Sequence, residues 1–572
     1  MDMKKILIYL IPCILVFTSC EDFLDTKNYT KKDTSNFPAT LDDAQQMVAG
    51  IYATQILAAS ASEQTNFYIS ELASDERFGG GGENDKKMQA YDKLMANEVN
   101  MLEGFWTNRY RGIFRANMGI ETIDNCEGFT SEDQKNQMKG EIYFLRGYFY
   151  NDMAELFGNV PLVLSTEPKN LPKAETDAIY GQIAYDLKTA IEMMPAKSYT
   201  SVESGHATKW DAQAMMARVF LFYTGFYNKE SLPLSDADGN ISGSITKDQV
   251  IGWLEDCMNN SGHDLLSDYR SLWAYSNQWT AKDYPYVGDV RWAGDGHANK
   301  EKMFSIKFSS MAEWIGTQNA YSNQYALHFS LRSNNGTEGT FPFGRGWGAG
   351  PVNTTIWNEW KQAEPADMRR EASIADMENE VPDYQWGQDA QVEETGFWAK
   401  KYMNFQAYNA DRERFDQFGV LEWNSKNDIA LGNPTDVALI RFADVLLMHS
   451  ELKQDVMGIN RVRQRAGLEP LSAYSLDAIK KERRFELAFE GRRWADIRRW
   501  GDAPALLEKQ INVDIKNIGA DAVMKSFGPG LRARYEATKG FFPIPESQIE
   551  LSDGVLEQNS GWGTLEALYQ GW

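Results

Sequence analysis

Aromatic side chains, tryptophan above all, are the residues of this chain best suited to recognise a ligand. The sequence has 17 Trp and 26 Tyr, and aromatic residues make up 13% of it. Many of the tryptophans fall between residues 261 and 406, where the sequence is also rich in Gly, Asn and Tyr. The apolar faces of sugar rings stack on flat indoles, while carboxylates, amides and guanidinium groups hydrogen-bond the sugar hydroxyls. Tryptophan also fills cores and protein interfaces, so each one alone supports either reading.

A second set of candidate residues surrounds four consecutive glycines, residues 79–82. Four glycines in a row cannot form the interior of a helix, so we expect a flexible loop here. The loop lacks the Lys-Ser/Thr pair of a phosphate-binding loop. It is either a binding loop or a plain connector, and both readings stay open at this point. The polar residues that it carries are Asp75, Glu76, Arg77, Asn84 and Asp85.

The sequence has no motif for catalysis, for a cofactor or for a metal ion. No G-x-S-x-G, H-E-x-x-H or dinucleotide fingerprint occurs, and the histidines lack partners at metal spacing. The acidic stretch 236–240 fails as a calcium loop, because Gly239 stands at position four and Lys247 at position twelve. Among 81 Asp and Glu, a pair at glycosidase spacing is expected by chance. These absences favour a binding protein that uses no cofactor.

Charge and cysteine content narrow the class further. The formal net charge of −23 argues against binding nucleic acid or bare anionic lipid. Four cysteines occur, and two of them, Cys126 and Cys257, lie in the body of the chain. Two are too few for a disulfide framework, and whether they pair is left open.

The first residues have the pattern of an export signal. Two lysines precede an apolar run over residues 6–17 that is too short to span a bilayer stably. Residues 17–20, Phe-Thr-Ser-Cys, resemble a lipobox, although Phe17 stands where Leu is commonest. We predict a lipoprotein signal peptide over 1–19, a lipid on Cys20 and a flexible tether over 20–38. An ordinary secretory signal is the alternative.

Helical periodicity flanks the aromatic-rich segment on both sides. Apolar spacing and end signals predict helices over about 41–57, 138–157, 176–194, 206–222, 246–260, 437–452 and 459–467. Residues 303–308 alternate like a short strand. Gly158 is expected to end the helix over 138–157.

Residues 480–501 predict one long helix that carries many charges. The opposite charges Arg483–Glu486, Glu490–Arg493 and Arg493–Asp496 are three residues apart, close enough to pair within a helix. Two tryptophans among these charges indicate a helix that packs on several neighbours, which satisfy its ions. A solvated charged face is the alternative.

Several of these stretches resemble one known family. Residues 482–501, ERRFELAFEGRRWADIRRWG, and 439–451, LIRFADVLLMHSE, are similar to C-terminal signatures of SusD/RagB-type nutrient-binding lipoproteins of the outer membrane. FLRGYFY (144–150) and LFGNVPLV (156–163) resemble an earlier signature, and 541–549 resembles the closing segment. Residues 105–120 resemble a helix that packs early in the family's fold. Residues 20–25, CEDFLD, are similar to the family's mature start.

The resemblance implies a mainly α fold, SusD-like, with tetratricopeptide-like helix pairs and a large loop-rich aromatic insert. It divides the chain into an N-terminal helical region (39–260), a ligand-binding insert (261–435), and a C-terminal helical region with a closing strap (436–572). It implies no catalysis and no cofactor. It implies a SusC-like TonB-dependent transporter as partner, and attachment to the outer membrane through lipid on Cys20.

In such proteins, variable loops of the early helical region and of the insert form the ligand shelf. By this resemblance we predict that the glycine-rich loop faces aromatics of the insert and that together they bind an oligosaccharide. The predicted contacts are Asp75, Arg77, Asn84, Asp85, Trp273, Trp279, Trp292 and Trp347. Two alternatives remain, a peptide-binding relative of the same family and a surface glycosidase on a helical scaffold.

Overall fold

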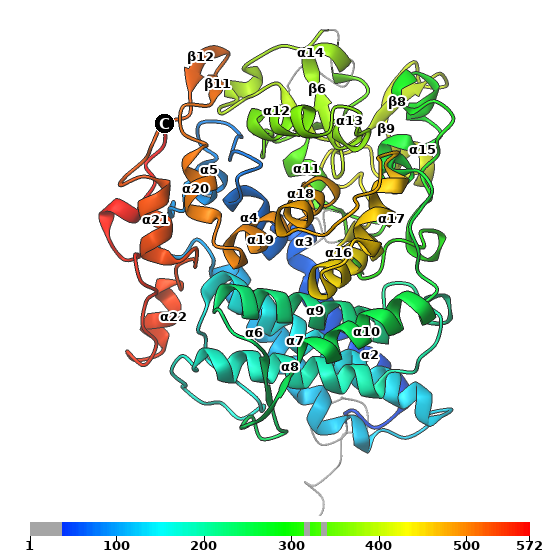
Figure 1. The fold of residues 1–572 in the computed structure, drawn as a ribbon, viewed down its shortest axis with the longest axis vertical. Coiled ribbons are helices and arrows are strands. Elements are labelled where there is room, and N and C mark those ends of the chain that lie inside the picture. The colour runs from blue at the N-terminus through cyan, green and yellow to red at the C-terminus, as the bar shows by residue number, and fades with distance from the viewer. Residues whose placement is uncertain (1–36, 314–320, 333–339, 382) are drawn as a thin grey trace, which may run out of the picture.

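The structure is a computed structural model that describes residues 37–313, 321–332, 340–381 and 383–572. Helices make up most of its regular structure, and its strands are short and paired two by two (Figure 1). The mainly α fold predicted from the sequence is therefore confirmed. The predicted signal peptide, Cys20 and nearly all of the tether lie outside the described residues.

A stack of long helices forms the lower half of the molecule as drawn in Figure 1. Each helix from α6 to α10 packs on the next one along the chain, and α2 packs on α6 and α7. Close contact depends on small residues, because a Cβ on Gly147 of α7 would lie 3.2 Å from the Cβ of Asp186 on α8. The helices are α2 (Leu41–Tyr52), α6 (Glu103–Thr122), α7 (Glu132–Phe157), α8 (Thr176–Met193), α9 (Lys209–Phe226) and α10 (Lys247–Asn260).

Local signals explain where these helices begin and end. Thr40, Thr208 and Thr246 each cap a helix, and in all three cases the N3 side chain bonds back to complete a capping box. Gly158, with φ of +70°, ends α7 as predicted. A hairpin of β1 (Leu232–Ser235) and β2 (Ile241–Ile245) turns at the acidic stretch 236–240.

Shorter elements build the upper half. Early in the chain come α3 (Leu57–Ser60), α4 (Asn66–Ala73) and α5 (Lys86–Tyr91). The insert supplies α11 (Gln324–Phe329), α12 (Thr354–Ala363), α13 (Arg369–Ser373), α14 (Met377–Glu380) and α15 (Phe418–Trp423). Its strands are β3 (Ser305–Ile306), β4 (Leu331–Arg332), β5 (Arg345–Gly346), β6 (Ile374–Asp376), β7 (Phe397–Ala399), β8 (Gln406–Asn409) and β9 (Arg414–Gln417).

The described strand pairs are antiparallel, apart from the parallel pair β4–β5. The strand predicted within 303–308 is β3, which pairs with β10 (Val437–Ala438). The C-terminal elements are α16 (Phe442–Lys453), α17 (Met457–Arg465), α18 (Leu476–Glu486), α19 (Arg493–Arg499), α20 (Ala503–Glu508), β11 (Asp514–Asn517), β12 (Ala520–Val523), α21 (Leu531–Thr538) and α22 (Glu546–Leu551). The predicted boundaries at 260 and 435 stay predictions.

The long helix predicted over 480–501 is wrong, because the chain breaks between α18 and α19. Phe489 and Gly491 both have positive φ, +62° and +70°. The amide of Gly491 donates to Glu71 Oε1 at 2.6 Å, and a Cβ on Gly491 would lie 2.8 Å from the Phe67 ring. The break lets α18 pack on α16 while α19 packs on α4 and α9.

The charges of this stretch are buried and paired, as predicted, but with other partners. None of the three ion pairs predicted within the helix is formed by these described residues. Arg483 instead pairs with Asp444 at 2.6 Å and with Asp496 at 2.8 Å. Glu486 receives three guanidinium groups, those of Arg369, Arg441 and Arg465. Contacts with other elements therefore satisfy most of these ions, and Asp496–Arg499 is a local pair within α19.

Two further observations bear on the class of protein. No described helix combines the length and the apolar character needed to cross a membrane. Cys126 and Cys257 are both buried and unpaired, so they do not form a disulfide with one another.

Candidate functional site

The glycine-rich segment, residues 79–82, is a packed strand-like connection and not the flexible loop predicted from sequence. All four glycines are buried. Gly80 forms an isolated bridge with Ala349 on one side, and Gly82 forms one with Gln391 on the other. The amide of Gly81 donates to the carbonyl oxygen of Gly348 at 2.7 Å. The segment is thus held between two loops of the insert.

Lack of space and positive φ together explain the four glycines, since Gly80 and Gly81 both have positive φ. A Cβ on Gly79 would lie 2.4 Å from the Gln89 Cα, and one on Gly82 would lie 2.5 Å from the Arg332 guanidinium. Gly80 also has φ of +67°, and its Cβ would meet Pro351 at 2.4 Å. A side chain on Gly80 would push residues 348–351 of the insert away, and one on Gly79 would collide with the backbone of α5.

Arg332 joins three loops at the surface beside this segment. Its guanidinium pairs with Asp85 Oδ2 at 2.9 Å and donates to the carbonyl oxygen of Trp347 at 3.0 Å. Its Nε donates to the carbonyl oxygen of Asp389 at 2.9 Å. Asn84 is exposed next to Asp85, and the Trp347 side chain is 43% exposed. We call Asn84, Asp85, Arg332 and Trp347 the Trp347 shelf.

The Trp347 indole rests on a rigid base. Its ring lies 4.6 Å from the buried imidazole of His328, centroid to centroid. His328 Nδ1 shares a hydrogen bond of 3.3 Å with the Tyr68 hydroxyl. Burial lowers the pKa of His328, so the ring is neutral near pH 7. A neutral, hydrogen-bonded ring under the indole fixes its position without adding charge to the shelf.

A buried ion cluster supports the glycine segment from below. Lys93 pairs with Asp92 at 2.6 Å and with Glu393 at 2.5 Å. Asp92 accepts the Gly79 amide at 2.8 Å, and Glu393 accepts the Gly80 amide at 2.9 Å. Burial and the neighbouring Glu393 raise the pKa of Asp92 to about 8. These buried contacts therefore fix the position of the glycine segment that leads to Asp85.

Three of the predicted ligand contacts are buried, and their side chains contact other residues of the protein. Asp75 receives the Arg493 guanidinium at 2.7 and 2.9 Å, and only 4% of Asp75 is exposed. Arg77 pairs with Glu71 at 2.7 Å and is 1% exposed. Trp273 is 2% exposed and packs edge-on against Tyr269 and Tyr402. Their side chains serve as internal contacts where the structure places them.

Trp279 and Trp292 lie together but away from the Trp347 shelf. The Trp279 indole donates to Glu422 at 2.8 Å, and Trp292 packs edge-on against Phe418 and Trp423. All three partners belong to α15, so these tryptophans surround that helix. Of the eight predicted contacts, the structure brings together Asn84, Asp85 and Trp347.

Sequence reasoning missed Arg332 and His328. Arg332 follows α11 on a two-residue strand, and no spacing signal marks it in the sequence. Its partner Asp85 lies 247 residues earlier in the chain. His328 has no partner at metal spacing, and a histidine that packs against a tryptophan from another segment leaves no pattern in the sequence. In the described part of the chain no group of three or more His, Cys, Asp or Glu could hold a metal ion.

Two family models match the chain, one after the other. The model described as "Starch-binding associating with outer membrane" matches residues 22–221, and the SusD family model matches residues 292–562. The chain belongs to the SusD/RagB family. Curated relatives span it from end to end. SusD-like protein P2 of Formosa agariphila is 22% identical over 98% of this chain and 100% of its own length. A SusD-like protein of Bacteroides ovatus is 22% identical over 96% of both chains.

Solved structures share the fold. Surface glycan-binding protein A from Bacteroides fluxus is 23% identical, with a TM-score of 0.68 over 92% of this chain and 100% of that one. Surface glycan-binding protein A from Bacteroides thetaiotaomicron, solved in complex with laminarihexaose, is 19% identical with the same TM-score and the same coverage. At these identities the likeness shows the fold and not the ligand.

Proposed function

We propose that the protein binds an oligosaccharide on the Trp347 shelf and passes it, unaltered, to a SusC-like TonB-dependent transporter. The observation that carries this proposal is the half-exposed Trp347, whose backbone carbonyl accepts a hydrogen bond from Arg332, which also pairs with Asp85 next to the exposed Asn84. An indole offers a flat apolar face to a sugar ring, and the three polar groups match its hydroxyls.

The shelf is held in place before any ligand arrives. Arg332 is anchored by three contacts, Asp85 accepts the Gly82 amide at 2.7 Å, and Trp347 rests on His328. Groups that are already ordered lose little conformational entropy on binding, which favours affinity on a small surface.

The solved relatives suggest which glycan to test first. One was solved with laminarihexaose, and another is described as a laminarin-binding SusD-like protein, 23% identical with a TM-score of 0.67. Laminarihexaose is therefore the first probe. A lipid on Cys20 would keep the protein at the outer membrane, next to the proposed transporter, without any membrane-spanning helix.

The test compares the chain without its signal peptide and two variants. Trp347→Ala should weaken laminarihexaose binding at least tenfold, about 1.4 kcal/mol, in isothermal titration. Trp279→Ala is the matched control, because the Trp279 indole contacts Glu422 of α15 and no residue of the shelf. The affinity of this variant for laminarihexaose should equal that of the parent.

The proposal fails if Trp347→Ala binds as tightly as the parent while its circular dichroism is unchanged. Binding of peptides in place of every glycan tested would select the peptide-uptake alternative. Shortening of the hexasaccharide by pure protein would select a glycosidase.

A further inference from the structure

A recess lies on the helical side of the molecule, apart from the Trp347 shelf. It encloses about 410 Å³, inside the range of about 300–1,000 Å³ typical of small-molecule sites. Tyr52 and Ile56 form one wall, and Ile306, Phe308 and Tyr321 form the other. None of its lining residues belongs to the Trp347 shelf. We call it the Tyr52 cleft.

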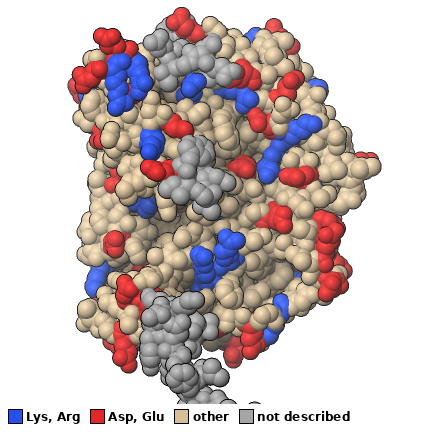
Figure 2. All heavy atoms as spheres, turned by 180° about the vertical axis from the view of Figure 1, so that it is seen from behind, with Lys and Arg blue, Asp and Glu red and all other residues tan. Residues whose placement is uncertain are grey.

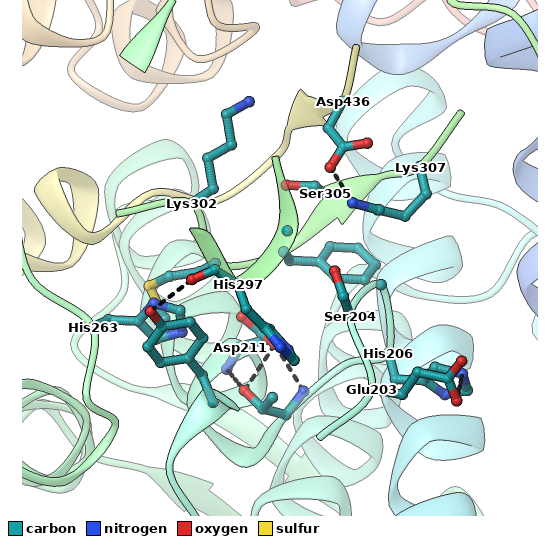
Figure 3. A pocket seen from close by; sticks show the side chains of 16 residues that line it. Glu203, Ser204, His206, Asp211, His263, His297, Lys302, Ser305, Lys307 and Asp436 are labelled. Atoms are coloured by element: carbon teal, nitrogen blue, oxygen red, sulfur yellow. Dashed lines mark hydrogen bonds and ion pairs between the residues drawn. The ribbon is translucent and has the colours of Figure 1, made fainter. Parts of the chain in front are cut away.

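The Tyr52 cleft adjoins a smaller polar pocket of about 40 Å³, whose lining side chains Figure 3 shows. The two share Ser204, Gly205, His206, Ser305 and Lys307 as lining residues. Three of the five histidines of the chain line the polar pocket, namely His206, His263 and His297. The combined site thus has apolar and aromatic walls and a polar floor.

Polar atoms at this site are buried without a hydrogen-bond partner among the described residues. They are Ser305 Oγ and Asp211 Oδ1 at the polar floor, and Gln55 Oε1 in the wall of the cleft. Asp211 is only 2% exposed, and its other carboxylate oxygen is used by Thr208. Leaving a buried polar atom without a partner is unfavourable, so hydroxyl groups from a ligand or from water would be favoured here.

The basic groups at the polar floor already have acidic partners. Lys307 is paired with Asp436, as Figure 3 shows, and His206 Nδ1 lies 2.7 Å from Glu141. A charged ligand would have to break such a pair, whereas a neutral hydroxylated ligand would not. The face of the molecule seen in Figure 2 likewise shows acidic and basic side chains interspersed, with broad areas of neither.

We propose that the Tyr52 cleft is a second binding site, for an end unit of a neutral oligosaccharide. A sugar ring would stack on Tyr321, whose side chain is 61% exposed, and on the wall formed by Phe308. Its hydroxyls would reach Gln55 and Ser305, and through the polar pocket Asp211. The choice of a sugar rests on the proposed function, but the place of the site does not depend on the Trp347 shelf.

Titration calorimetry on four proteins separates the two sites, with laminarihexaose, maltohexaose and cellohexaose as probes at millimolar concentration. Ala53→Trp places an indole in the cleft from an exposed lining position. Gln46→Trp is the matched control, because Gln46 is exposed on α2 and does not line the cleft. Trp347→Ala removes the shelf.

We expect two molecules of at least one probe per parent chain, one per Ala53→Trp chain, and two per Gln46→Trp chain. Hydrogen exchange of the parent should slow with ligand in peptides covering residues 49–59 and 303–308. This readout does not depend on how a variant folds.

The two proposals fail separately. If the parent binds one molecule, and this binding is lost in Trp347→Ala but kept in Ala53→Trp, the proposed cleft site is refuted and the shelf site stands. Loss in Ala53→Trp but not in Trp347→Ala would uphold the cleft and overturn the shelf. Unchanged exchange in residues 49–59 and 303–308 with all three probes would also overturn the cleft.

Discussion

Replacing Glu486 by Gln should destabilise the protein strongly, because its carboxylate is shared by three buried guanidinium groups. Arg465 lies 2.5 Å from it, Arg369 3.0 Å and Arg441 3.1 Å. The Glu486 side chain is 0% exposed, so water cannot take the place of the lost charge. A Gln amide keeps the shape, but it is neutral, and its NH₂ group would face N–H donors.

The pKa of Glu486 gives the magnitude. Burial would raise this pKa, but Arg465, Arg441 and Arg369 together lower it from 4.5 to about 2. Because the folded state favours the ionised form, this stabilisation is complete above pH 4.5 and is lost as the pH falls toward 2. The gap corresponds to roughly 3 kcal/mol. Removing one partner of a buried ion pair costs about 3–5 kcal/mol, which agrees.

The measurement is urea unfolding at neutral pH, followed by tryptophan fluorescence and by circular dichroism. Glu486→Gln should lose about 3–5 kcal/mol of unfolding free energy. Glu508→Gln is the matched control, since Glu508 pairs with Arg532 on the surface and should show no measurable loss. Equal losses in the two variants would refute the reasoning, because they would mean that the three arginines find other partners or water.

Three further predictions follow from single contacts. Gly491→Ala should lower the unfolding free energy more than Gly467→Ala does. Both glycines have positive φ, but only a Cβ on Gly491 would collide with a neighbour, the Phe67 ring. The midpoints of urea unfolding of the two variants measure this difference. Lys93→Met should speed hydrogen exchange in residues 79–82 and weaken laminarihexaose binding, because the buried acidic side chains of Asp92 and Glu393 lose the ammonium group that joins them. Burial raises the pKa of Asp211 from 3.8 to about 6, so the folded state binds the proton more tightly than the unfolded state. The unfolding free energy therefore falls as the pH rises from about 4 to about 6. Asp211→Asn should reduce this pH dependence, as measured by urea unfolding at several pH values.

Helices could be predicted because their signals are local. Helix α10 begins after Thr246, whose capping box with Gln249 is visible in the sequence, and α7 ends at Gly158. The cap and the first turn lie within a few residues, so no knowledge of the tertiary structure is needed. The break after α18 escaped prediction because the residues that contact Gly491 there, Phe67 and Glu71, lie more than four hundred residues earlier in the chain.

The burial of the predicted ligand contacts could not be predicted for the same reason. Asp75 is a residue type typical of surface loops, and the partner that allows its burial, Arg493, is 418 residues away in the chain. Charged residues are almost never fully buried unless they are paired, so burial of Asp75 follows only once that partner is known. The glycines beside it suggested mobility, whereas other residues approach them closely, Gln89 of α5 at Gly79 and residues 348 and 351 at Gly80.

One segment links the ion pairs of the core to the proposed ligand shelf. Its first part is fixed to α19 through the Asp75–Arg493 pair, and its glycines are held by the insert loops and by Lys93 through Asp92 and Glu393. Its last residue, Asp85, then meets Arg332 at the surface. Because the contacts from Asp75 to the glycines are buried, and Asp85 Oδ2 accepts hydrogen bonds from both the Gly82 amide and Arg332, the position of Asp85 is set by the core. This explains how a shelf built from loops could bind a flexible sugar without first having to order itself.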